Sequence, residues 1–163
     1  MPVWVLSLIA VVGALVLRQG PDWADPDPRV ISGAATVVDG DSLEISGRRI
    51  RLHGIDAPEG PQVCMRGHEA WACGRDATRY LVSLVAEREV TCSVAHRDQH
   101  GRFLSTCQSA GRELNREMVA SGFAVAFGET YRSVEAEARS MRRGLWGSTF
   151  ERPKEWREQN NQR

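Results

Sequence analysis

VDGDSLEISGRRIRLHGIDAPE, residues 38–59, contains two polar turns on either side of a segment in which apolar and polar residues alternate. The first turn, DGDS, has the Gly and Asp residues that tight turns prefer. Alternation in LEIS and RRIRLHGI, on the two sides of Ser46 and Gly47, is typical of a β-hairpin. One face of the hairpin would point into a core through Leu43, Ile45, Ile50 and Leu52. The other face would carry Arg49 and Arg51.

Charged side chains cluster in the same stretch. The carboxylates are Asp39, Asp41, Asp56 and Glu59, and the guanidinium groups are Arg48, Arg49 and Arg51. Ala57 and Pro58 would end the third strand at Asp56, because proline has no backbone N–H to donate. A solvated hairpin explains any one of these charges. Together, however, hard carboxylate oxygens beside guanidinium groups suit a divalent cation and a phosphate, which is the chemistry of phosphodiester cleavage.

Further motifs follow at ordered positions. The chain has DGDS at 39–42, Arg51, DAPE at 56–59, HGR at 100–102, LNREMVASG at 114–122 and GLW at 144–146. This series resembles the staphylococcal nuclease (thermonuclease) family. The family pattern is a DGDT-type turn, a strand with an arginine, D-x-P-E, Y-G-R, N-x-x-L-V-x-x-G and G-x-W. Each motif alone is a weak signal, but the unbroken order from Ile31 to Trp146 is a strong one.

The order of expected elements is three strands, a helix, two strands and two helices. Apolar residues at helical spacing predict the first helix, from residue 74 or 75 to 87: Ala77, Leu81, Leu84 and Val85. Strands at 89–96 and 102–107 flank a DQHG turn, and helices are expected at 114–121 and 134–143. Five short antiparallel strands with a helix after the third describe an OB-fold Greek-key barrel. We therefore predict a mainly β, α+β domain with about three helices, and the resemblance implies the same fold.

An apolar run, MPVWVLSLIAVVGALVL, precedes Arg18. As a helix with a rise of about 1.5 Å per residue it would span roughly 25 Å, near the lower limit for crossing a membrane. No clear small-x-small cleavage site follows it. The pattern favours an uncleaved hydrophobic signal-anchor helix over a cleaved signal peptide. A buried core helix is the remaining alternative, and the uniform apolarity argues against it.

Four segments are expected along the chain. Residues 1–18 are the signal anchor or signal peptide, and 19–30 form a linker rich in Pro and Asp. Residues 31–150 form the OB-fold domain, and 151–163 form a polar tail without a pattern. We expect export to a bacterial-type cell envelope, either anchored in the membrane through residues 3–17 with the domain outside the cytoplasm, or secreted.

The cysteines support that location. Four cysteines after an export-type segment favour disulfides in an oxidising compartment. Cys92 and Cys107 lie at equal distances from the middle of the DQHG turn, so a hairpin would place them face to face. That pairing leaves Cys64 with Cys73. Four reduced thiols or a zinc site are the alternatives, but paired C-x-x-C spacing is absent.

The charge of the chain is balanced. Twenty-one Lys and Arg residues match 21 Asp and Glu residues, for a formal net charge of +0 at pH 7. A protein that holds nucleic acid by overall charge is usually basic, so recognition of phosphate here must be local. The expected partner is DNA or RNA, preferably single-stranded, and no obligate protein partner is evident from the sequence.

The resemblance implies a role for each motif residue. Asp41, Asp56 and a backbone carbonyl near Ala57 would hold Ca²⁺ through hard oxygens. Glu59 would orient or deprotonate the attacking water. Arg51 and Arg102 would clamp the phosphate and stabilise the negative charge of the pentacovalent state. In the family the attack is in line and leaves a 3′-phosphate.

The chain departs from the family pattern at several positions. His100 and Phe127 stand where the family has tyrosines, and Lys154 is the one lysine of this chain, whereas the family uses several lysines around its substrate. Tyrosine hydroxyls that contact phosphate would be missing, although Phe127 could stack on a base. Asn115 would cap its helix or bond a neighbouring loop, with capping favoured.

Two other functional classes remain open. A catalytically weak or inactive nucleic-acid-binding or calcium-binding module of the cell envelope is the first, and retention of Arg51, Glu59 and Arg102 argues against it. A non-enzymatic envelope protein that uses the barrel for protein contacts is the second, and the balanced charge is its best support. The expected function is a calcium-dependent nuclease.

Overall fold

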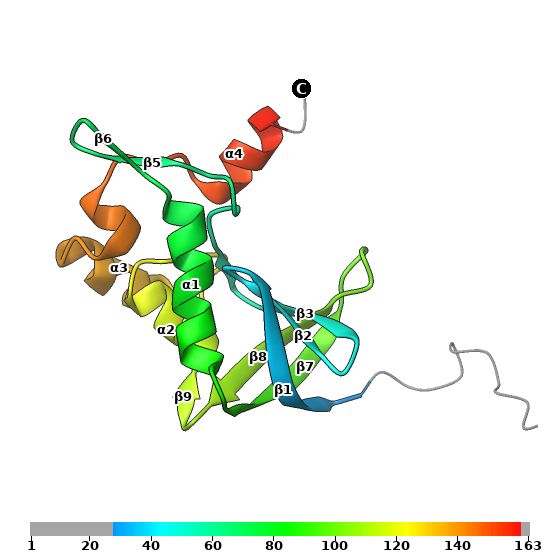
Figure 1. Cartoon of the computed structure of the whole chain (residues 1–163). Helices are drawn as coiled ribbons and strands as arrows, with labels where there is room; N and C mark the ends of the chain where they lie inside the picture. The colour runs from blue at the N-terminus through cyan, green and yellow to red at the C-terminus, as the bar shows by residue number, and fades with distance from the viewer. Residues whose placement is uncertain (1–27, 161–163) are drawn as a thin grey trace, which may run out of the picture.

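Five strands close into a barrel in the computed structural model, which describes residues 28–160 (Figure 1). They run in the order β3-β2-β1-β7-β8, and β3 also pairs with β8. Their bounds are β1 Val30–Asp39, β2 Ser42–Ile45, β3 Arg48–Leu52, β7 Glu89–Arg97 and β8 Phe103–Ser109. The expected α+β class is confirmed, and the five-stranded barrel is consistent with the expected OB-fold.

One barrel pair is parallel, contrary to the expectation of antiparallel strands alone. Ile50 of β3 faces Phe103 of β8 in a parallel pair, whereas the other four pairs of the ring are antiparallel. The reason is geometric. Directions cannot alternate completely around a ring with an odd number of strands, so one neighbouring pair must run the same way.

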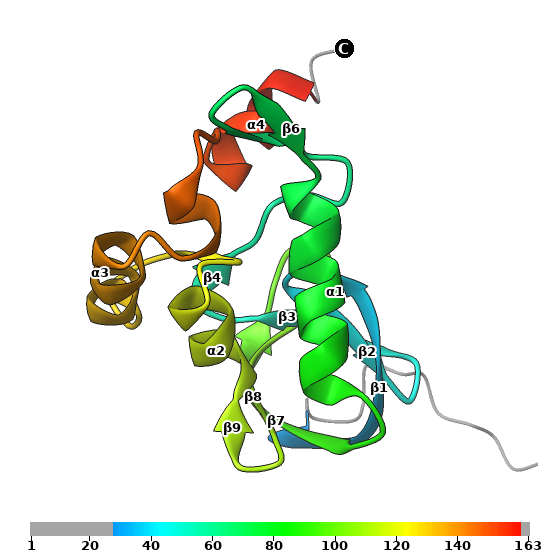
Figure 2. The ribbon, with the colours of Figure 1, turned by 60° about the vertical axis from the view of Figure 1, so that its left-hand side comes forward.

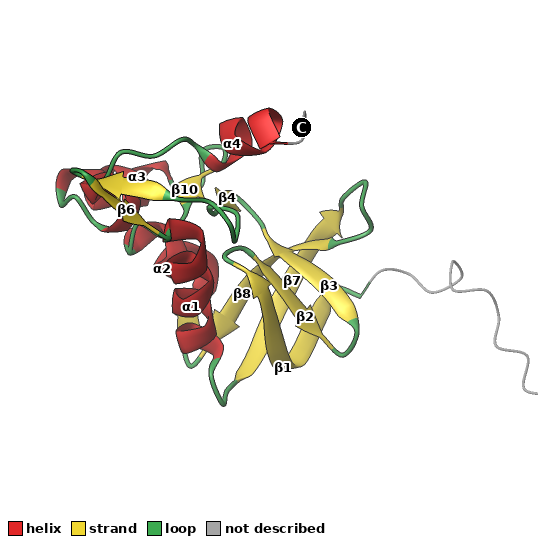
Figure 3. Ribbon diagram, turned by 45° about the horizontal axis from the view of Figure 1, so that its top comes forward, coloured by secondary structure: helices red, strands yellow, loops and turns green. Residues whose placement is uncertain are grey.

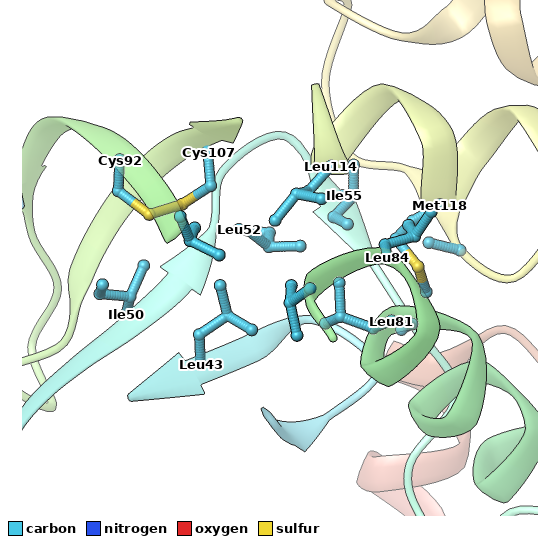
Figure 4. Packing of buried hydrophobic residues seen from close by; sticks show 14 of the residues in the cluster. Leu43, Ile50, Leu52, Ile55, Leu81, Leu84, Cys92, Cys107, Leu114 and Met118 are labelled. Atoms are coloured by element: carbon cyan, nitrogen blue, oxygen red, sulfur yellow. A yellow bond between two sulfur atoms is a disulfide. The ribbon is translucent and has the colours of Figure 1, made fainter. Parts of the chain in front are cut away.

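The β2–β3 hairpin has the predicted faces. Leu43 lies opposite Ile50, and both side chains are fully buried with Ile45 and Leu52 (Figure 4). Before the hairpin, the DGDS turn packs tightly on the barrel. A Cβ on Gly40 would lie 2.7 Å from that of Ala57 and 3.1 Å from that of Ala77, so only glycine fits there. This packing places the turn against the segment that follows β4, Ile55–Asp56.

Helix α1, Cys73–Val85, covers the barrel with the predicted apolar stripe. It begins at Cys73, just before the expected start, and α2, Leu114–Ala120, packs beside it (Figure 2). Asn115 of α2 caps no helix end. Its side chain instead accepts a hydrogen bond from the amide of Cys107 and donates to the carbonyls of His53 and Ser105, which ties α2 to the barrel. The favoured capping role is therefore wrong.

Short elements complete the fold (Figure 3). They are β4 Ile55–Asp56, β5 Cys64–Arg66, β6 Glu69–Trp71, β9 Arg112–Glu113, β10 Val125–Ala126, α3 Arg132–Ser140 and a 3-10 turn at Gly144–Gly147. β4 pairs with β10, and β5 with β6. A fourth helix, α4 Pro153–Asn160, forms where the sequence indicated a polar tail without a pattern. The described chain thus has four α-helices rather than about three.

Both expected disulfides are present. Cys92 pairs with Cys107 directly across β7 and β8, and their bridge lies in the core (Figure 4). Cys64 pairs with Cys73, which joins β5 to the start of α1. The second bridge packs in a smaller apolar cluster with Trp71, Val125 and Leu145.

The expected signal-anchor helix, and the linker up to residue 27, lie outside the described residues. Between residues 28 and 160, no helix has the length and apolar character needed to cross a membrane.

Candidate active site

A cavity of about 930 Å³ opens on the side of the barrel where β3, β4, the β7–β8 turn and α4 meet. Charged side chains and histidines dominate its wall. The lining includes Asp39, Arg49, Arg51, Asp56, Glu59, Arg102 and Arg157, together with His53, His96, His100 and Phe127. The cavity therefore collects most of the charged residues that the motifs singled out, but Asp41 is not in its lining.

One guanidinium joins the two expected metal ligands. Arg51 donates one hydrogen bond of 2.9 Å to Asp41 Oδ1 and one of 2.8 Å to Asp56 Oδ1. The carboxyl side chains are 4% and 5% exposed, whereas that of Arg51 is 19% exposed toward the cavity. The barrel register explains the first contact, because Arg51 lies opposite Ser42, the neighbour of Asp41. Pairing of Asp56 with Val125 fixes the second carboxylate.

Asp41 lies under the cavity wall rather than in it. Its Oδ2 accepts the amide of Ala57 at 2.9 Å, and its Oδ1 also accepts the Ser42 hydroxyl at 3.1 Å. Burial raises the pKa of Asp41 to about 7 against the lowering effect of Arg51, and nearby Asp39 and Asp56 add to the rise. A cation at this position would favour the charged carboxylate over the neutral acid.

Glu59 is positioned by its backbone. Its carbonyl accepts the amide of Gln62 at 2.8 Å, and the Gln62 side chain accepts the amide of Glu59 at 3.3 Å. The start of α1 touches the same carbonyl, because a Cβ on Gly74 would overlap it. The 30% exposed side chain of Glu59 then turns toward the cavity.

Arg157 of α4 reaches the same carboxylates. It donates to Asp56 Oδ1 at 2.9 Å, to Asp56 Oδ2 at 3.1 Å and to Glu59 Oε1 at 2.8 Å. Burial alone lowers the pKa of the guanidinium, but its bonds with Asp56 and Glu59 raise that pKa above its ordinary value. Sequence reasoning missed this residue. Proline at the first position of α4 and Glu155 in its first turn signal a helix start, but nothing local points to Asp56.

Arg102 lines the cavity from the β7–β8 turn and has a different partner from Arg51. Its guanidinium pairs with Asp98 Oδ2 at 2.8 Å, and Asp98 Oδ1 accepts the amides of His100 and Arg102 at 2.9 Å each. Burial raises the pKa of Asp98, but these hydrogen bonds outweigh it and lower the pKa below the ordinary value. Arg102 thus shares the cavity with Arg51 and Glu59 but is held by the β7–β8 turn.

An aromatic and imidazole rim completes the cavity. His100 and Phe127, which replace family tyrosines, both line it, and Phe127 is 65% exposed. His53 and His96 lie next to each other with ring centroids 5.9 Å apart. The sequence offered no signal for these two histidines beyond their place in alternating strands.

The expected metal ligands fit a hard cation by chemistry. Within residues 28–160, no group of three or more His, Cys, Asp and Glu side chains is arranged to hold a metal. The expected calcium site does not need three such side chains, because its ligands are two carboxylates, a backbone carbonyl and waters. Asp41 and Asp56 already converge on one positive group, the Arg51 guanidinium.

Comparisons with known proteins agree with these features. A family model described as "Staphylococcal nuclease homologue" matches residues 49–148, more than half of the chain. "Succinoglycan biosynthesis protein ExoI" of Rhizobium meliloti (strain 1021) is 39% identical over 145 residues, covering 84% of this chain and 73% of that protein. "Uncharacterized endonuclease" of Escherichia coli O157:H7 is 36% identical, covering 68% and 72%. "Probable endonuclease LCL3" of Schizophyllum commune (strain H4-8 / FGSC 9210) is 29% identical, covering 66% and 44%.

Proposed function

Because the chain belongs to the staphylococcal nuclease homologue family, we propose that it is a calcium-dependent nuclease that hydrolyses phosphodiester bonds of DNA or RNA. The observation that carries the proposal is that Arg51, in the wall of an open cavity, joins Asp56 of the same wall to the buried Asp41. Relatives named as endonucleases support the reaction class. The calcium dependence rests on the hard oxygen donors and on what the resemblance to the family implies.

Asp41, Asp56 and a backbone carbonyl near Ala57 would hold the ion. When bound, calcium supplies positive charge that polarises a phosphoryl oxygen and favours ionisation of water. Hard carboxylate oxygens suit calcium, and a flexible coordination shell tolerates a site built on a turn. Magnesium requires a stricter octahedron and is expected to support little turnover.

Glu59 is the proposed general base. Its carboxylate faces the cavity from a loop that Gln62 and α1 hold in place. From there it would orient the attacking water and accept its proton as the new P–O bond forms. The leaving oxygen departs on the opposite side of phosphorus in an in-line displacement.

Arg51 and Arg102 are the proposed phosphate clamp. They line one cavity from different places, Arg51 from β3 and Arg102 from the end of the β7–β8 turn. Asp98 presents Arg102 in a fixed orientation, and Asp41 with Asp56 presents Arg51. Two planar guanidinium groups can donate paired bonds to the phosphoryl oxygens and stabilise the added negative charge of the transition state.

The proposed substrate is a single-stranded nucleic acid. The exposed Phe127 ring at the cavity rim gives a surface on which an unpaired base can stack. A chain with zero formal charge has no general attraction for a polyanion, so affinity must come from these local contacts.

We also propose that the domain works in an oxidising compartment. Two disulfides in residues 28–160 favour export, as does the apolar run ahead of them. Residues 19–30 would then act as the linker that holds the domain off the membrane, if the apolar run remains as an anchor.

A weakly active or inactive nucleic-acid-binding module is the second candidate. Two observations favour it: Arg157 covers Asp56 and Glu59, and one relative carries a name from succinoglycan biosynthesis rather than an endonuclease name. The two candidates differ in whether the bound strand is cut.

A zymogram of the purified protein on single-stranded DNA separates them. We expect a cleared band with calcium and none in excess chelator. Full activity in chelator would contradict the calcium site, and binding of the strand without cleavage in calcium would favour the module.

A further inference from the structure

Helix α4 brings a third arginine onto the carboxylates of the candidate active site. We propose that Arg157 is a positioning residue that competes with the divalent cation for Asp56, so that it holds α4 closed over the site until the cation displaces it. The inference rests on the proposed function, because it concerns the same calcium site. It assigns a role to a segment that no family motif covers.

The contact is specific in geometry. The two terminal nitrogens of Arg157 take the two oxygens of Asp56, at 2.9 and 3.1 Å, in the parallel fork that arginine and carboxylate prefer. The first nitrogen also reaches Glu59 at 2.8 Å. One cation from α4 therefore joins a proposed metal ligand to the proposed base.

Every carboxylate oxygen of the two proposed side-chain ligands already has a protein donor. Asp41 Oδ1 accepts from Ser42 and Arg51, and its Oδ2 accepts from the Ala57 amide. Within residues 28–160, Asp56 Oδ1 accepts from Arg51 and Arg157, and its Oδ2 accepts from Arg157 alone. Oδ2 of each carboxylate has a second lone pair, but a cation on Asp56 Oδ2 would lie against the positive Arg157 guanidinium, so displacing Arg157 removes that repulsion and frees the oxygen.

Arg157 is also the donor most easily released. Arg51 lies in the middle of the barrel, on β3, and its side chain is 19% exposed, whereas that of Arg157 is 32% exposed. Within α4 only Pro153 is buried, and most of the other residues are exposed. Releasing Arg157 therefore disturbs an outer helix, whereas releasing Arg51 disturbs the barrel.

The attachment of α4 allows such a movement. Its leading segment is fixed to the β5–β6 hairpin, because Thr149 and Met65 exchange backbone bonds of 2.8 and 2.9 Å. Gln62 donates to the carbonyl of Glu151 at 2.8 Å, and in Figures 1 and 2 α4 lies next to this hairpin. The start of α4 is thus tethered, while Arg157 holds the part nearer its end.

Electrostatics sets the sign of the coupling. A divalent cation on Asp56 repels a guanidinium on the same carboxylate, so each ligand weakens binding of the other. Removing the guanidinium should therefore tighten binding of the cation, and adding the cation should free α4.

The test is calorimetric titration of calcium into the full chain without substrate. Wild type is compared with Arg157→Gln and with Lys154→Gln, which removes the same charge from a 68% exposed position on α4. We expect Arg157→Gln to bind calcium roughly tenfold more tightly than wild type, a typical size for coupled sites, and Lys154→Gln to match wild type. Hydrogen exchange of the amides of residues 156–160 should speed up on adding calcium to wild type.

Three results would overturn the inference. If Arg157→Gln binds calcium no more tightly than wild type, Arg157 does not compete with the cation. Unchanged or slower hydrogen exchange of α4 in calcium means that the cation does not release the helix. An equal gain in Lys154→Gln means that the effect is general charge. If none of the three proteins binds calcium, the calcium site itself is contradicted. That result differs from failure of the inference, because wild type then binds no calcium either.

Discussion

At the scale of single residues, the Arg51 guanidinium determines how the candidate site is arranged. It spans Asp41 and Asp56, which come from two turns separated by the hairpin, and it faces the cavity from a cross-strand position. A planar fork with several donors can make both contacts at once. A lysine ammonium at the same place is a point charge that cannot.

Arg51→Lys should lower the rate of strand cleavage by about 10² or more, because the clamp on the phosphoryl oxygens is lost. Arg48→Lys, an exposed change on the same strand, is the matched control and should cleave at the wild-type rate. Initial rates on a single-stranded oligonucleotide give the comparison. Near-normal cleavage by Arg51→Lys would mean that Arg51 binds no reacting group.

Asp98 gives a prediction with a defined pH dependence. The pKa of its carboxylate is lowered from 3.8 by hydrogen bonds from Arg102 and His100. The ionised form therefore stabilises the folded protein above pH about 4, and this contribution disappears as the pH falls through the folded-state pKa. Asp98→Asn should cost about 1 kcal/mol of unfolding free energy at pH 7 and less at pH 3. A urea-denaturation cost that is as large at pH 3 as at pH 7 would contradict this assignment.

At the scale of elements, the start of α1 sets the place of the Glu59 loop. The backbone of Gly74 donates to the Gln62 carbonyl at 3.2 Å and lies against the carbonyl of Glu59 so closely that a Cβ has no room. Helix and loop therefore move together. The catalytic role proposed for Glu59 depends on this contact between elements.

Gly74→Ala should displace the loop, lower the free energy of unfolding by about 2 kcal/mol and reduce cleavage. Gly60→Ala is the control, since a Cβ there meets nothing within 4 Å. Denaturation curves and cleavage rates of the two variants should separate clearly. Equal stability of both variants would show that the loop can relax without cost.

The second prediction at this scale concerns the stability that the Cys92–Cys107 bridge contributes. It closes a loop with a sequence separation of 15 between two paired strands. Replacing both cysteines by alanine should cost about 3 kcal/mol, through the entropy that the unfolded chain regains. Denaturation in guanidinium chloride measures this difference in the free energy of unfolding. A double variant as stable as wild type would mean that the bridge contributes nothing.

At the scale of the whole molecule, the local patterns were enough for most of the barrel. The two-residue period placed Leu43 and Ile50 inside and Arg51 outside, and symmetry about one turn paired Cys92 with Cys107. Those signals are local because strand alternation and hairpin register depend on near neighbours. Arg102 is assigned to the site only by the resemblance, through the HGR motif, and its ion pair with Asp98 of the same turn was not predicted.

Arg157 could not be predicted in that way. It lies 101 residues from Asp56, and its position depends on the path of the chain past the β5–β6 hairpin. Polar residues near the end of a chain have no periodic signal for what they contact. The active site proposed from motifs was therefore incomplete on the side where α4 covers it.

The most direct test of the account is the rate of single-stranded DNA cleavage by Glu59→Gln in saturating calcium. The account predicts a rate lower than wild type by about 10² or more, with an unchanged fold and no weaker calcium binding, because the amide cannot accept the proton of the attacking water. A rate within about twofold of wild type would contradict the assignment of Glu59 as the base, and with it the proposed mechanism.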